Sequence, residues 1–159
     1  MTWIEADYQR TFEVDAPVEE VAEFLSTPSS IRDCMVDLQR AERIDDQTYR
    51  WVLEEVGAKN ITFQGDYTVK YRRDGNTVRW ESIGEGTMRT EGSAQLESLG
   101  DRRTRIDYRE TIASDLPVPK LARRVFKPLV ARETRKGIEG YLEEVIAHLN
   151  AGPDSGDES

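Results

Sequence analysis

Hydrophobic and polar positions alternate through the middle of the chain. The alternating runs cover residues 39–44, 48–56, 61–71, 77–83, 88–99 and 104–112. Such alternation is typical of β-strands with one buried face, and residues 8–14 add an earlier strand of the same kind. The links between the runs are short and rich in Gly and Asp, which favours antiparallel hairpins. We therefore expect one antiparallel sheet of seven strands.

Helical patterns stand on both sides of these strands. The sequence Asp15-Ala-Pro-Val-Glu-Glu-Val21 predicts a helix to about Leu25, and a second short helix is expected from Pro28 to Met35. After Leu116-Pro-Val-Pro119 the chain is expected to be helical to about Asn150. These elements predict an α+β helix-grip fold, in which a curved sheet wraps around the C-terminal helix.

The apolar stripe of the C-terminal helix changes side along its length. Its first part has Leu121, Val125, Phe126 and Leu129, and its second part has Ile138, Tyr141, Leu142, Val145 and Leu149 on nearly the opposite side. Pro128 lies near the change, and a proline inside a helix removes a hydrogen bond and clashes with the preceding turn. We expect the helix to be interrupted near Pro128. Residues 1–150 should form a single domain, and 151–159 a disordered acidic tail.

One face of the predicted sheet mixes large apolar side chains with a few polar ones, as in a pocket for a hydrophobic ligand. The residues expected to line it, with the facing helix, are Trp51, Phe63, Tyr67, Trp80, Met88, Thr90, Tyr108, Glu110, Phe126 and Val130. Gly65 and Gly92 fall in mid-strand on this face, where they would curve the sheet or leave space for a ligand. An inward carboxylate is costly unless it is paired, protonated or beside a cavity, and in a plain core Glu110 would pair with Arg132 or Arg135.

The net charge of −9 argues against nucleic acid as the main partner, because phosphate binding needs a surface excess of Lys and Arg. Residues 120–136, however, have a net charge of +6. Within them a basic patch recurs at helical spacing, formed by Lys120, Arg123, Arg124 and Lys127. We interpret this patch either as a solvated face or as a transient contact with an anionic partner, such as a membrane surface or an acidic protein.

The sequence contains few of the residues that metal sites and catalytic nucleophiles require. Cys34 is the only cysteine and His148 the only histidine, so no metal site and no catalytic triad is expected, and no cofactor motif is present. We interpret His148 as a surface residue at a helix C-terminus and Cys34 as a structural thiol. A single cysteine, no signal-peptide pattern and no long apolar stretch favour a cytoplasmic location.

The order of elements, together with Asp15-Ala-Pro-Val-Glu-Glu-Val21, resembles the START-like superfamily (SRPBCC, Bet v 1-like), which includes polyketide cyclases and lipid-transfer proteins. The resemblance covers roughly residues 5 to 150 and implies the helix-grip fold. Segments 25–34, 63–65, 92–96 and 104–108 look like the branch associated with carbon monoxide dehydrogenase, which implies a membrane-associated binder of a lipid or quinone. The Pro-Gly expected after the cysteine is Met35-Val36 here, and no apolar anchor follows the last helix.

These observations leave three hypotheses for function. The first is a non-enzymatic binder or carrier of a lipid, quinone or polyketide-like molecule, held between the sheet and the C-terminal helix. The second is a cyclase or hydratase in which Glu110 transfers protons and Tyr67 or Tyr108 donates a hydrogen bond. The third is a protein-binding module whose core is filled by its own side chains. The sequence leaves the oligomeric state open.

Overall fold

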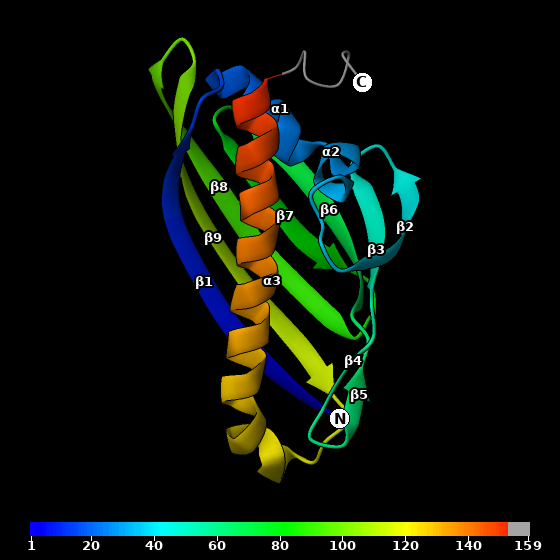
Figure 1. Cartoon of the computed structure of the whole chain (residues 1–159). Coiled ribbons are helices and arrows are strands. Elements are labelled where there is room, and N and C mark those ends of the chain that lie inside the picture. Colours follow the sequence, from blue (N-terminus) through cyan, green and yellow to red (C-terminus); the bar gives the residue numbers. More distant parts are fainter. Residues whose placement is uncertain (153–159) are drawn as a thin grey trace.

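A seven-stranded antiparallel sheet curls around one long helix in the computed structural model, which describes residues 1–152 (Figure 1). The strands are β1 (Thr2–Val14), β2 (Leu38–Asp45), β3 (Thr48–Leu53), β4 (Val56–Ala58), β5 (Ile61–Phe63), β6 (Asp66–Asp74), β7 (Thr77–Ile83), β8 (Met88–Gly100) and β9 (Arg103–Leu116). The helices are α1 (Val18–Ser26), α2 (Pro28–Arg32), the short 3-10 helix η1 (Lys120–Ala122) and α3 (Arg123–Ala151). The α+β helix-grip fold expected from the sequence is confirmed.

The strand order in the main sheet is β1-β9-β8-β7-β6-β3-β2, and every neighbouring pair is antiparallel. Strand β1 pairs with β9 along its whole length, from Thr2 opposite Leu116 to Val14 opposite Thr104. The first strand, β1, therefore lies at the edge of the sheet beside the last strand, β9. Of the acidic tail predicted for 151–159, Ala151 ends α3, while residues 153–159 lie outside the described residues.

A separate small hairpin is the main difference from the predicted strands. The runs 48–56 and 61–71 are each broken, so that β4 and β5 leave the main sheet and pair only with each other. Lys59 and Asn60 form the turn between them with φ of 51° and 67°. Positive φ at both central residues is the conformation of a type I′ hairpin turn, and the turn lies in the gap between the two predicted runs.

The predicted interruption of the C-terminal helix is wrong, because α3 runs unbroken through Pro128. Pro128 removes the helical donor to the Arg124 carbonyl, and both residues are exposed, so the carbonyl can be solvated instead of buried without a partner. The first part of the apolar stripe is also only partly buried. The helix buries Phe126, Val130, Ile138, Leu142, Val145 and Leu149. Leu121 and Val125 remain 96% and 59% exposed, and the helix therefore has no need to bend to bury them.

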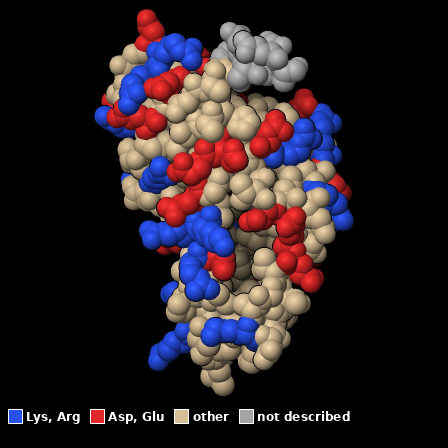
Figure 2. All heavy atoms as spheres, in the orientation of Figure 1, with Lys and Arg blue, Asp and Glu red and all other residues tan. Residues whose placement is uncertain are grey.

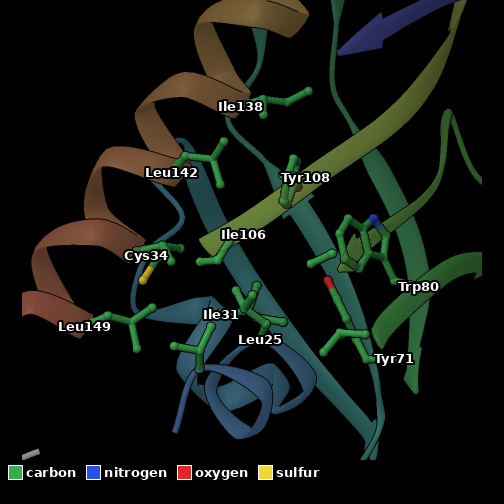
Figure 3. Close-up of a cluster of buried hydrophobic side chains, with 14 of the residues drawn as sticks. Leu25, Ile31, Cys34, Tyr71, Trp80, Ile106, Tyr108, Ile138, Leu142 and Leu149 are labelled. Carbon is green, nitrogen blue, oxygen red and sulfur yellow. The ribbon is translucent and has the colours of Figure 1, made fainter. Parts of the chain in front are cut away.

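Two apolar clusters are stacked along α3. The larger joins the sheet to α1, α2 and the C-terminal part of α3 (Figure 3). Trp51, Ile106 and Leu142 are fully buried in it. The smaller one consists of Ile4, Leu116, Val118, Phe126 and Val130, against which Ile61 and Phe63 of the β4–β5 hairpin pack. The hairpin is thereby fixed to the start of α3. Within residues 1–152, no helix is long and apolar enough to cross a membrane.

Candidate ligand-binding site

A cavity of about 540 Å³ lies between the concave face of the sheet and α3. Its walls include residues of the larger cluster, such as Leu25 and Ile138, and of the smaller one, such as Leu116 and Val130. The lining also reaches exposed residues of the β4–β5 hairpin, among them Val56. Figure 2 shows a hollow on this face, between α3 and the hairpin. The volume is within the range of about 300–1,000 Å³ that is common for small-molecule sites.

Seven of the ten residues predicted to line a pocket lie in the wall of this cavity. They are Phe63, Tyr67, Trp80, Met88, Tyr108, Glu110 and Val130. Trp51 is not in the wall, since it is fully buried and donates from Nε1 to the Tyr71 hydroxyl at 3.1 Å. Phe126 belongs to the smaller cluster, and Thr90 contacts Glu110 instead of the cavity. Whether the seven contact a ligand stays a prediction.

Glu110 accepts three hydrogen bonds from neighbouring side chains, and among residues 1–152 it has no cationic partner. Trp80 Nε1 donates to Oε2 at 3.2 Å, Thr90 Oγ1 donates to the same oxygen at 2.5 Å, and Tyr108 Oη donates to Oε1 at 2.6 Å. The alternative partners Arg132 and Arg135 are exposed on α3, where Arg132 lies 3.8 Å from Glu133. The inward carboxyl is therefore satisfied by neutral donors and borders the cavity.

Gly92 explains how Trp80 reaches Glu110. In the sheet register Trp80 is opposite Gly92, and Gly92 is opposite Glu110 on the next strand. A Cβ at Gly92 would lie 2.6 Å from the indole of Trp80. The missing side chain thus lets the indole lie across β8 and donate to a carboxylate two strands away.

The space above the two mid-strand glycines is therefore filled by side chains. At Gly65 an added Cβ would clash with the Met88 sulfur and lie 3.0 Å from Leu53. At Gly92 the Trp80 indole takes the corresponding position. Gly65 nevertheless lies in the cavity wall, whereas Gly92 does not. That these glycines curve the sheet or leave space for a ligand stays a prediction.

Burial controls the protonation of the groups at the inner end of the cavity. It raises the pKa of Glu110 above the usual glutamate value, and the hydrogen bonds from Thr90, Tyr108 and Trp80 partly offset this rise. Burial also raises the pKa of Tyr67 and Tyr141, so both hydroxyls are neutral at physiological pH. Neither hydroxyl has a hydrogen-bond partner among residues 1–152, and Tyr67 and Tyr141 both line the cavity.

Several further wall residues were not predicted from the sequence, of which Tyr71, Gly137 and Tyr141 are the most informative. Tyr71 continues the alternation of Tyr67 on β6, and Tyr141 belongs to the apolar stripe of α3, so both had a periodic signal. Gly137 had none. It follows Val130 by seven residues and precedes Tyr141 by four, which places it on the face of α3 toward the sheet.

Cys34 and His148 lie apart from this chemistry. Cys34 is buried, and burial, reinforced by Asp33 and Glu144, raises its pKa to about 12, so the thiol is protonated at neutral pH. His148 is exposed in the last turn of α3, as predicted, with Nδ1 2.9 Å from the Glu144 carbonyl oxygen and 3.8 Å from the Cys34 sulfur.

We expect the stability of the protein to depend on pH through Glu110. The pKa of Glu110 is higher in the folded protein than in the unfolded chain. Such a carboxyl contributes fully to the free energy of unfolding at pH values below its unfolded-state pKa, and this contribution is lost as pH rises through the folded-state pKa. Glu110→Gln removes this dependence. Urea unfolding across a pH series should therefore show the variant gaining on the wild type as pH rises above the ordinary glutamate range.

The exposed Glu91 on β8 provides the control, because Glu91→Gln should follow the wild type at every pH. A constant offset between Glu110→Gln and the wild type at all pH values would contradict a raised pKa for Glu110.

Comparisons with known proteins place the fold among its relatives. A conserved protein from Geobacillus kaustophilus is 18% identical with a TM-score of 0.68, covering 92% of this chain and 95% of that one. The ZhuI aromatase/cyclase from Streptomyces sp. R1128 is 13% identical with a TM-score of 0.70, covering 91% and 93%. A START superfamily protein from Mycobacterium smegmatis is 15% identical with a TM-score of 0.65, covering 91% and 97%. At these identities the likeness establishes the fold alone.

The sequence comparisons address the family directly. No curated protein sequence matches the chain. The likeness to the branch associated with carbon monoxide dehydrogenase is tested by none of the comparisons and stays a prediction. The family model described as "Polyketide cyclase / dehydrase and lipid transport" matches residues 5–151, nearly the whole chain. With the START-like helix-grip fold and its cavity, this match shows that the chain belongs to the polyketide cyclase/dehydrase and lipid transport family.

Proposed function

We propose that this protein binds a hydrophobic small molecule, such as a lipid, a quinone or a polyketide-like compound, between the sheet and α3. The observation that supports this best is the 540 Å³ cavity, which has largely apolar walls and is bordered by the Glu110 carboxyl. Apolar walls favour the body of the ligand by the hydrophobic effect. The free hydroxyls of Tyr67 and Tyr141 and the carboxyl of Glu110 would orient a polar group at its inner end.

The expected affinity is moderate. A ligand that buries about 300 Å² of apolar surface gains up to about 7 kcal/mol before ordering costs, which corresponds to micromolar binding at best. Such an affinity suits a protein that takes up and releases its ligand.

Titration with N-phenyl-1-naphthylamine, an uncharged apolar fluorophore, tests the proposal. Trp80 lines the cavity, so its emission should be quenched by energy transfer as the probe fluorescence rises, with one site per chain and a Kd in the micromolar range. Absence of saturable binding by this probe and by a long-chain fatty alcohol would contradict a ligand-binding cavity.

Catalysis is a second candidate, favoured by the raised pKa of Glu110 and by its lack of a cationic partner in the described part of the chain. A carboxyl of this kind suits proton transfer to or from a polyketide-like substrate, as in a cyclase or hydratase. Tyr108 already donates to Glu110, so Tyr67 is the better donor to a substrate. In this case Glu110→Gln would abolish turnover of a poly-β-ketone substrate and spare probe binding, whereas equal turnover would exclude Glu110.

A protein-binding module with a filled core receives less support, because a cavity of this size stands where the filled core was expected. The cytoplasm remains our proposed compartment, since the single cysteine, Cys34, has no second cysteine with which to form a disulfide.

A further inference from the structure

One end of the molecule differs in charge from the rest. It comprises residues 117–132 and the β4–β5 hairpin, residues 56–63, and we call it the basic end. It contains no Asp or Glu and six cations, Lys59, Lys120, Arg123, Arg124, Lys127 and Arg132, so that the remainder of the chain has a net charge of −15. All six are exposed. Only Arg132 has an acidic neighbour within 4 Å in the described part of the chain, so the other five charges face solvent.

Apolar side chains protrude between these cations. Leu121 is 96% exposed, Val125 59% and Val56 58%. Leu121, Val125, Pro128 and Arg132 follow at spacings of three and four residues, which places them on the outer face of η1 and α3. Leu121 and Val125 were assigned to the first part of the apolar stripe, and the structure exposes both of them.

The two parts of the basic end are held together and adjoin the cavity. Ile61 and Phe63 of the hairpin pack in the same cluster as Phe126 of α3, and both parts lie at the lower end of the molecule in Figure 1. Val56 and Leu129 belong to the cavity wall. Gly57 and Ala58 of the hairpin also line the cavity and are exposed, so a surface that met the basic end would lie against one wall of the cavity.

We propose that the basic end docks on an anionic lipid bilayer, with Leu121 and Val125 inserted among the headgroups and the cavity opening held at the lipid surface. This inference rests on the proposed function for its purpose, which is ligand exchange with the membrane, but the docking itself needs no ligand. Separate protruding apolar residues surrounded by Lys and Arg match an interface of lipid headgroups and acyl chains. An acidic protein would match the charges but would need a complementary pocket for Leu121.

Co-sedimentation with vesicles tests the proposal. The wild-type protein should bind vesicles of equal parts phosphatidylcholine and phosphatidylglycerol, and should bind pure phosphatidylcholine only weakly. Each cation near an anionic surface raises the partition coefficient about fivefold, so Arg123→Glu with Arg124→Glu should lower it by at least about thirtyfold. Leu121→Ser with Val125→Ser should lower it by about tenfold, which long-range charge attraction alone would not produce.

The matched control is Lys70→Glu with Arg79→Glu, two exposed cations of the main sheet whose reversal changes the net charge by the same amount. It should keep at least half of the wild-type vesicle binding. All the variants should retain their far-UV circular dichroism and their affinity for N-phenyl-1-naphthylamine. Equal binding to both vesicle types, no binding to either, or equal losses in the control and the Arg123/Arg124 variant would overturn the docking and leave the cavity proposal standing.

Discussion

Gly137→Trp is expected to weaken binding of N-phenyl-1-naphthylamine by at least about a hundredfold while the protein remains folded. Gly137 lies on α3, toward the sheet, and lines the cavity. An added Cβ there would meet no atom within 4 Å, which is unusual for an inward position. An indole buries about 150–250 Å², an area similar to that of a small ligand, and would therefore occupy the same space. The probe titration measures this loss directly.

Gly137→Ala is the matched control. It adds one methyl group to the same open space and replaces the poorest ordinary helix former by the best, so it should raise the free energy of unfolding by up to about 1 kcal/mol and keep probe binding. If Gly137→Trp were folded and bound the probe as the wild type does, the cavity beside α3 would not be the binding site.

Gly92→Ala is expected to lower the free energy of unfolding by about 3 kcal/mol, a large effect for one methyl group. Its Cβ would lie 2.5 Å from the Arg109 carbonyl oxygen, which is backbone, and 2.6 Å from the Trp80 indole. Relief of both contacts requires β8 and β9 to separate or Trp80 to leave its place, and the latter removes a donor from Glu110. Urea denaturation followed by circular dichroism measures the change.

Gly100→Ala controls for the general cost of replacing a glycine in β8. Gly100 ends the same strand, an added Cβ would have no neighbour within 4 Å, and the change should be within about 0.5 kcal/mol of neutral. Two variants of equal stability would mean that Trp80 does not pack on Gly92 as described.

The fold was accessible from the sequence because its signals are periodic. Alternation along β6 to β9 separates the buried face from the solvent-exposed face, and the order of the predicted elements is what resembles the family. The α3 prediction failed for a specific reason. Leu121 and Val125 were placed in an apolar stripe by their spacing, but apolar residues need not be buried. Because both are exposed, the helix does not have to break at Pro128 to bury them.

The site was accessible only in part. Alternation placed Tyr67, Trp80, Tyr108 and Glu110 on the inner face, where the structure has them in the cavity wall. It does not separate a residue that lines a cavity from one behind it, which is why Trp51 was included. Nor does it show that the space beside Gly92 belongs to Trp80 while the space beside Gly137 is open, since both facts depend on packing between distant segments.

The central claim, that the cavity holds a hydrophobic small molecule, is tested most directly by native mass spectrometry of protein purified from its own source, followed by organic extraction. We predict a stoichiometric lipid, quinone or polyketide-like compound on the wild type and on Gly137→Ala, and its loss from Gly137→Trp. A wild-type protein that carries no such molecule and takes up none from an extract of the source cells would contradict the account.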